Sequence, residues 1–121
     1  MPTFQLASTV LGAPDPQVLA DFYRELLGWE QKYAEPGWVM LASPNGYGLS
    51  FQSEEHHVRP VWPGEPGEQQ QQLHLDIRVD DLAAASARAE QLGAVLAEFQ
   101  PQEGVRVHLD PAGHPFCLFE Q

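Results

Sequence analysis

The sequence predicts an α+β fold made of two βαβββ modules in one chain. Residues 9–30 (TVLGAPDPQVLADFYRELLGWE) and 76–96 (DIRVDDLAAASARAEQLGAVL) repeat the same order of features: an alternating strand, an acidic turn and a helix that ends in Leu-Gly. Residues 42–52 (ASPNGYGLSFQ) and 109–120 (LDPAGHPFCLFE) each combine a turn containing Pro and Gly with a following strand. A stretch rich in Pro, Gly and Gln separates the copies. We therefore expect one domain over 1–121, with a first module at 1–53, a linker at 54–72 and a second module at 73–121.

The first module is predicted to begin with a strand at residues 4–12. Asp15 can accept hydrogen bonds from the free N–H groups of a helix start, and Pro16 suits the first helical position. Apolar residues then recur at helical spacing, at Val18, Leu19, Phe22, Leu26 and Leu27. Gly28 ends this helix. Three further strands are expected, at 29–33, 38–42 and 47–52.

The second module repeats this order from a strand at 73–79. Asp80 or Asp81 caps the helix, and Gly93 ends it. Its apolar face consists of Leu82, Ala85, Ala89 and Leu92. Strands follow at 94–99, 105–109 and 116–120. Since one module leaves a sheet face bare, we expect the two to pair in an open barrel-like mixed sheet, with helices outside and a concave small-molecule cavity inside.

Composition narrows the possible partners. The formal net charge is −11, from 17 acidic and 6 basic residues, so phosphate backbones would be repelled and nucleic acid is not expected. The acidic surface could attract a cationic small molecule or serve solubility alone. Cys117 is the single cysteine, which leaves no internal disulfide. Without a signal peptide pattern or a long apolar run, we expect a cytoplasmic protein with no membrane partner.

Four segments together resemble the vicinal oxygen chelate superfamily, which includes glyoxalase I, bleomycin-resistance proteins and extradiol dioxygenases. APDPQVLADFYRELLGWE is similar to its first-helix signature, and HLDIRVDDL and DPAGHPFCLFE are similar to the start and end of its second module. RPVWPGEP followed by QQLHLDI resembles, more specifically, glyoxalase-like proteins of high-GC bacteria. The resemblance covers essentially the whole chain. It implies paired βαβββ modules around a cavity and, for many members, a homodimer.

In metal-using members of this superfamily, the ligands come from the first and last strand of each module. Carried over to this sequence, the resemblance offers His74, seven residues before Asp81. Its equivalent in the first module is Ser8, seven residues before Asp15. Serine is a poor ligand for a divalent metal.

The last strand of the second module offers Glu120. Its equivalent is Gln52 if strand alternation sets the register, or Ser53 if the two glycine turns are aligned without a gap. We prefer Gln52, because Phe51 then faces the helix. His74 and Glu120, with Gln52 as a weaker ligand, could hold a divalent metal (Zn, Ni, Mn or Fe) completed by water or substrate oxygens. The same residues could instead bind a substrate with no metal.

His74 and Glu120 are also the candidate catalytic residues. His74 could act as a general base or be a satisfied polar residue of the sheet. Glu120 could move protons if a half-dry cavity raises its pKa, or it could be a solvated chain end. Asp76 and Arg78 share the His74 face; they could form a structural ion pair, or Arg78 could bind a substrate carboxylate.

Aromatic residues complete the predicted cavity. Trp62 could be a lid or pocket wall, or could join the two modules. Phe116 shares the two-residue row of Glu120 and is expected in the pocket, whereas Cys117 should face the helix as an inert buried thiol. The predicted substrate-binding residues are Ser8, Gln52, Trp62, Asp76, Arg78 and Phe116.

Three functions remain open at this level. The first is a glyoxalase-like lyase or isomerase that acts on an oxygen-rich carbonyl substrate through His74 and Glu120. The second is a metal-free protein of the bleomycin-resistance type that sequesters an antibiotic. The third, an extradiol-type dioxygenase, requires iron held by two His and one carboxylate, and only one His falls on a ligand position.

Overall fold

The structure, a computed structural model, describes residues 2–120. The chain divides between His57 and Val58 into two compact units. Each unit contains one four-stranded mixed sheet and one helix, so the predicted α+β fold with two βαβββ modules is confirmed. None of the described helices is long and apolar enough to cross a membrane.

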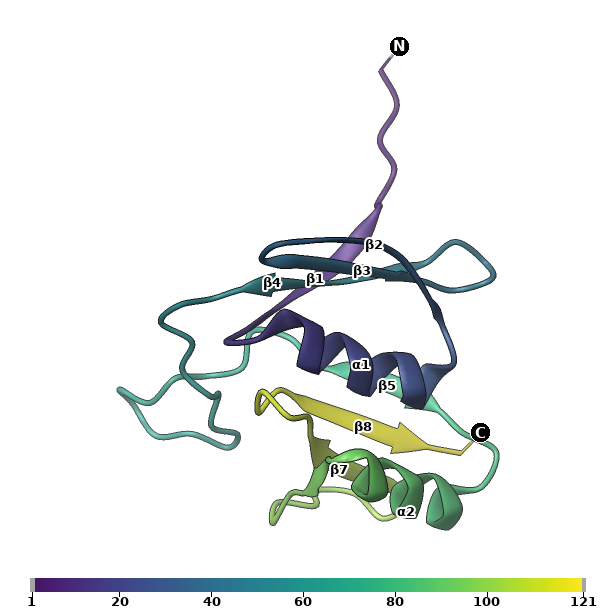
Figure 1. The fold of residues 1–121 in the computed structure, drawn as a ribbon. Coiled ribbons are helices and arrows are strands. Elements are labelled where there is room, and N and C mark those ends of the chain that lie inside the picture. Colours follow the sequence, from purple (N-terminus) through teal and green to yellow (C-terminus); the bar gives the residue numbers. More distant parts are fainter. Residues whose placement is uncertain (1, 121) are drawn as a thin grey trace. The chain divides into compact units, whose positions relative to one another are not determined.

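The first unit has the sheet order β1-β4-β3-β2, and α1 packs against β3 and β4 (Figure 1). β1 and β4 are parallel, and the other neighbours are antiparallel. The elements are β1 (Ser8–Ala13), α1 (Pro16–Leu27), β2 (Glu30–Glu35), β3 (Trp38–Ala42) and β4 (Gly48–Ser53).

The second unit repeats this topology with the sheet order β5-β8-β7-β6. β5 and β8 are parallel, and α2 contacts β6, β7 and β8. The elements are β5 (Leu75–Arg78), α2 (Leu82–Leu92), β6 (Val95–Leu96), β7 (Val105–Leu109) and β8 (Pro115–Phe119).

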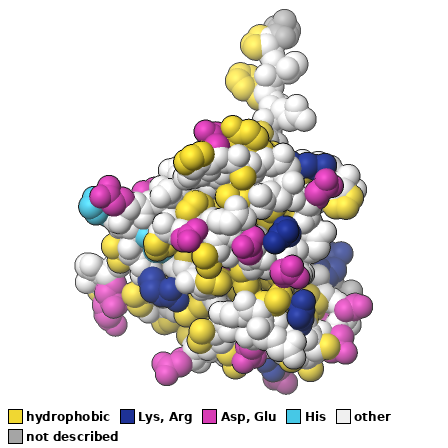
Figure 2. Space-filling model, viewed as in Figure 1, with side chains coloured by type: hydrophobic (Ala, Val, Ile, Leu, Met, Phe, Trp, Pro, Cys, Tyr) yellow, Lys and Arg dark blue, Asp and Glu magenta, His cyan; other side chains and the backbone are white. Residues whose placement is uncertain are grey.

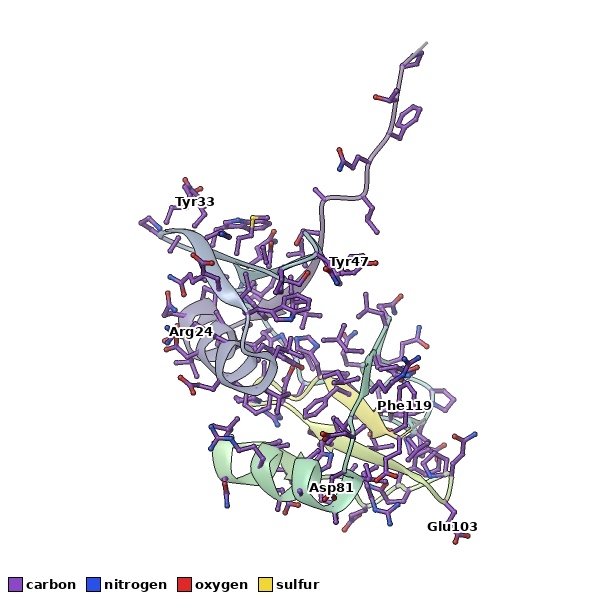
Figure 3. The ribbon with its side chains drawn as sticks, turned by 90° about the vertical axis from the view of Figure 1, so that its right-hand side faces the viewer. Arg24, Tyr33, Tyr47, Asp81, Glu103 and Phe119 are labelled. Carbon is purple, nitrogen blue, oxygen red and sulfur yellow. The ribbon has the colours of Figure 1, made fainter. Side chains whose placement is uncertain are left out.

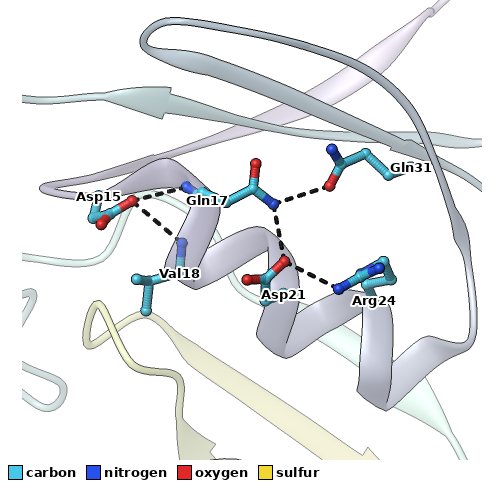
Figure 4. Close-up of polar contacts among 6 residues, drawn as sticks. All are labelled: Asp15, Gln17, Val18, Asp21, Arg24 and Gln31. Atoms are coloured by element: carbon cyan, nitrogen blue, oxygen red, sulfur yellow. Dashed lines mark hydrogen bonds and ion pairs between the residues drawn. The ribbon is translucent and has the colours of Figure 1, made fainter.

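Both helices begin and end where the sequence predicts. The Oδ1 atom of Asp15 accepts from the backbone N–H groups of Gln17 and Val18, at 3.1 and 3.3 Å (Figure 4). Asp81, rather than Asp80, caps α2 by accepting from the N–H of Ala84 at 3.0 Å. Gly28 and Gly93 end the helices with φ of 70° and 119°, conformations that glycine adopts without steric cost.

Three strands are shorter than expected: β1, β6, and β5, which spans Leu75–Arg78 instead of 73–79. The first begins at Ser8, because its pairing with β4 starts at Ser8 opposite Gly48. Residues 2–7 lead away from β1 (Figure 1), and Phe4 and Leu6 are 94% and 90% exposed. β6 spans only two residues, because the Gln100 side chain takes over the pairing: its amide bonds both backbone groups of Val107, at 2.9 Å each.

Each sheet buries one face beneath its helix. In the first unit, the Tyr23 ring of α1 stacks on Phe51 of β4 with ring centroids 5.8 Å apart, which confirms that Phe51 faces the helix. In the second unit, His108 of β7 stacks on Phe116 of β8 at 5.5 Å and bonds Ser86 of α2. Since these contacts cover the face of the second sheet toward α2, its other face is the one that can carry a site.

Candidate functional site

A pocket of about 640 Å³ lies in the second unit, on the sheet face opposite α2. Three adjacent strands supply most of its floor. The floor residues are Asp76 of β5, Val105 and Val107 of β7, Cys117 and Phe119 of β8, and His74, which directly precedes β5. Trp62, the loop 101–104 and Glu120 form its walls. Figure 3 shows Phe119 on β8 and Glu103 at the tip of that loop.

The strand register explains which side chains of β8 reach this pocket. Asp76 and Val107 both pair with Cys117, so these three residues form one row across the sheet. Successive side chains of a strand alternate between faces, which sends Phe116 to the α2 side. The expectations that Phe116 lines the pocket and that Cys117 faces the helix are therefore wrong.

The position of Glu120 explains why the sequence placed Phe116 in the pocket. Its row does contain Phe116, as alternation requires, but the row faces α2. The carboxylate Oε2 of Glu120 accepts a hydrogen bond of 2.6 Å from the backbone N–H of Leu82, at the start of α2. Glu120 also borders the pocket, so it lies between the helix and the site. Its catalytic role stays a prediction.

His74 is held by contacts on both ring nitrogens and on one ring face. Nε2 lies 3.2 Å from Oδ1 of Asp76, and Nδ1 lies 3.2 Å from the side-chain amide of Gln71. The Trp62 ring stacks on the His74 ring with centroids 5.4 Å apart and meets Phe99 edge-on at the same separation. Trp62 thus forms a wall of the pocket. The ionic partner of Asp76 is His74, and not Arg78.

Cys117 completes a group that could hold a metal ion. Ligand atoms of His74, Asp76 and Cys117 all lie within 4.8 Å of one another. Burial raises the pKa of the Cys117 thiol, and the negative charge of Asp76 raises it further. Nitrogen, carboxylate oxygen and sulfur are the donors that zinc prefers, and a bound cation would deprotonate the thiol.

The two glycine turns decide the repeat alignment. In both turns the glycine N–H donates to a carbonyl three residues earlier: Gly46 to Ser43 at 2.9 Å, and Gly113 to Asp110 at 2.8 Å. Aligned without a gap, the turns make Ser53 the equivalent of Glu120. The preference for Gln52 is therefore wrong, and the same alignment could have identified Cys117 as a site residue.

The same alignment makes Ser50 of β4 the equivalent of Cys117. β1 pairs Thr9 with Leu49, and β5 pairs Leu75 with Phe116, so Ser8 and His74 are equivalent, as expected. The Oγ atoms of Ser8 and Ser50 are 2.7 Å apart and share a hydrogen bond. The first unit thus carries a hydroxyl pair where the second carries imidazole and thiol.

The remaining predicted residues lie outside the pocket of the second unit. Arg78 is exposed at the end of β5, opposite Phe119, and does not line the pocket. Ser8 and Gln52 belong to the first unit, where the Gln52 amide lies 3.5 Å from Glu54. Roles for these residues in substrate binding stay predictions.

The pocket is acidic. Asp76, Glu103 and Glu120 line it, and no Lys or Arg is among its described lining residues. Elsewhere acidic and basic side chains are interspersed, as on the face in Figure 2. The pocket thus combines negative charge with the aromatic rings of Trp62 and Phe119.

Comparison with known proteins yields one family and many solved structures. The profile of the family described as "Glyoxalase-like domain" matches residues 8–119. A protein from Agrobacterium tumefaciens solved by NMR is 21% identical, with a TM-score of 0.72 over 98% of each chain. The antibiotic binding protein TnmS3 from Streptomyces sp. CB03234 is 22% identical, with a TM-score of 0.64 over 99% of this chain and 98% of that one. A lactoylglutathione lyase from Agrobacterium tumefaciens is 22% identical, with a TM-score of 0.64 over 99% and 96%. No curated protein sequence matches. At these identities the structures show a shared fold.

Proposed function

The chain belongs to the glyoxalase-like domain family, and we propose that its second unit binds a small cationic molecule with a flat apolar part. One observation carries this proposal. The pocket places the carboxylates of Asp76, Glu103 and Glu120 beside apolar side chains, with no Lys or Arg among its described lining. Carboxylates beside low-dielectric walls concentrate cations and disfavour anions.

The pocket walls suit the apolar part of such a ligand. Trp62 presents an aromatic face that can stack on a planar group or hold a cation over its ring. Val105, Val107 and Phe119 provide apolar area that a ligand would remove from water. The likeness in fold to an antibiotic binding protein supports sequestration as the class of function.

A matched ligand series tests this proposal. A planar aromatic amine is expected to raise the melting temperature and bind in calorimetry, whereas its carboxylate counterpart should not bind. Asp76→Asn is expected to weaken binding of the amine about two- to fivefold, because Asp76 is largely exposed and its charge is screened.

Glu98→Gln is the control, since Glu98 is an exposed carboxylate that does not line the pocket. Equal binding of the amine and the carboxylate, or equal losses in the two variants, would contradict the proposal.

The metal-binding group favours a second candidate, a metal-dependent lyase or isomerase. His74, Asp76 and Cys117 would hold the ion, and water or substrate oxygens would complete its coordination. When bound, such an ion supplies Lewis-acid polarisation of a carbonyl. Glu120, which borders the same pocket, would move the proton after releasing the N–H of Leu82.

Cobalt distinguishes this candidate, because a Co²⁺–thiolate bond gives a charge-transfer absorption. We expect this band in the wild-type protein, its loss in Cys117→Ser, and its displacement by zinc. His56→Ala is the control, since the His56 side chain is exposed. A wild-type protein with neither the cobalt band nor zinc binding would exclude the metal candidate and leave cation binding intact.

A further inference from the structure

Gln71 lies just before β5, between Trp62 and His74. Its Oε1 atom is 3.2 Å from Nδ1 of His74. If the amide is turned over, its nitrogen donates to that Nδ1 at 3.2 Å and to the carbonyl of Leu73 at 3.3 Å. Its oxygen then accepts from Nε1 of Trp62 at 3.2 Å. The two orientations occupy the same space, but they exchange the positions of the amide nitrogen, which donates, and the amide oxygen, which accepts.

Each orientation of the Gln71 amide selects a different tautomer of neutral His74. An amide nitrogen on Nδ1 requires an unprotonated Nδ1, so the proton lies on Nε2 and points to Oδ1 of Asp76, 3.2 Å away. An amide oxygen on Nδ1 requires the proton there and leaves the Nε2 lone pair free. The orientation with the amide nitrogen on Nδ1 makes three hydrogen bonds through Gln71, whereas the orientation with the oxygen on Nδ1 makes one, so the former is favoured.

We propose that Gln71 is a positioning residue that sets the tautomer of His74 and couples it to Trp62. A metal ion on Nε2 needs the lone pair, so the proton must move to Nδ1 and the amide must turn over. Trp62 then faces the amide nitrogen and loses its acceptor. Metal binding to Nε2 of His74 would thus free the indole N–H of Trp62 from its hydrogen bond to Gln71. The tautomer assignment stands independently of the proposed function, whereas its coupling to a metal rests on the second candidate function.

Nitrogen NMR of the full chain at alkaline pH tests the assignment, because the nitrogen shifts distinguish the two tautomers of a neutral imidazole. We expect the Nε2–H tautomer in the wild-type protein. In Gln71→Glu the carboxylate can only accept, so it should take both the Trp62 N–H and an Nδ1–H of His74 and reverse the tautomer. Gln72→Glu places the same charge one residue away, on an exposed side chain, and should keep the wild-type tautomer.

Zinc titration supplies the second measurement. Gln71→Glu is expected to bind Zn²⁺ about tenfold more tightly than Gln72→Glu, because a carboxylate on Nδ1 orients a metal-binding imidazole. The indole N–H signal of Trp62 should shift when zinc binds to the wild-type protein. An Nδ1–H tautomer in the wild-type protein, or the same tautomer in wild type and Gln71→Glu, would overturn the assignment. If the tautomer reverses but zinc binds to no variant, the metal candidate and the coupling fail and the assignment of Gln71 stands.

Discussion

Phe116→Ala is expected to lower the free energy of unfolding by about 3–5 kcal/mol, the range for truncating a buried aromatic side chain. Phe116 is 0% exposed and stacks on His108 beneath α2, so the variant leaves a cavity in the core of the second unit. Urea denaturation followed by circular dichroism measures this loss. It is a large share of the roughly 5–15 kcal/mol that stabilises an ordinary domain.

Phe119→Ala is the matched control, three residues along the same strand but on the pocket face. It should cost less stability than Phe116→Ala, because Phe119 is only partly buried, and should weaken binding of the aromatic amine. If Phe119→Ala were the more destabilising variant, or if Phe116→Ala reduced binding at unchanged stability, the assigned faces of β8 would be wrong.

The stability of the chain is expected to fall more steeply below pH 6.5 than its carboxylates alone would cause, because of His108. This side chain is 0% exposed, and burial lowers its pKa below 6.5, while Glu90 nearby opposes the shift. The folded state therefore keeps His108 neutral where the unfolded chain already binds a proton. Its contribution is complete above pH 6.5 and is lost as the pH falls toward the lowered pKa, by at most about 1.4 kcal/mol per pH unit.

Denaturation of wild type and His108→Gln between pH 8 and 5 isolates this contribution. Glutamine can keep a bond to Ser86, which lies 2.9 Å from Nε2 of His108, but does not titrate in this range. The difference in stability between the two proteins should change with pH below 6.5 and be constant above it. A pH-independent difference would show that another group causes the acid sensitivity.

Much of the fold is determined by the local sequence. Asp15 and Asp81 begin the helices and Gly28 and Gly93 end them, because capping needs only a short side chain or a left-handed backbone within one turn. The predicted bounds of β3 and β7 also agree with the structure, because alternating apolar residues bounded by turns define a strand locally. The repeat of these signals was sufficient to predict two βαβββ modules.

The site depended on contacts between elements. Strand alternation places Phe116 with Glu120 and separates both from Cys117, but it does not say which row faces the helix. The packing of α2 determines which row faces the helix, because its first N–H donates to Glu120 and its Ser86 forms a hydrogen bond with His108. Period-two patterning is the same for either face, so only the packing of α2 brought Cys117 into the pocket with His74 and Asp76.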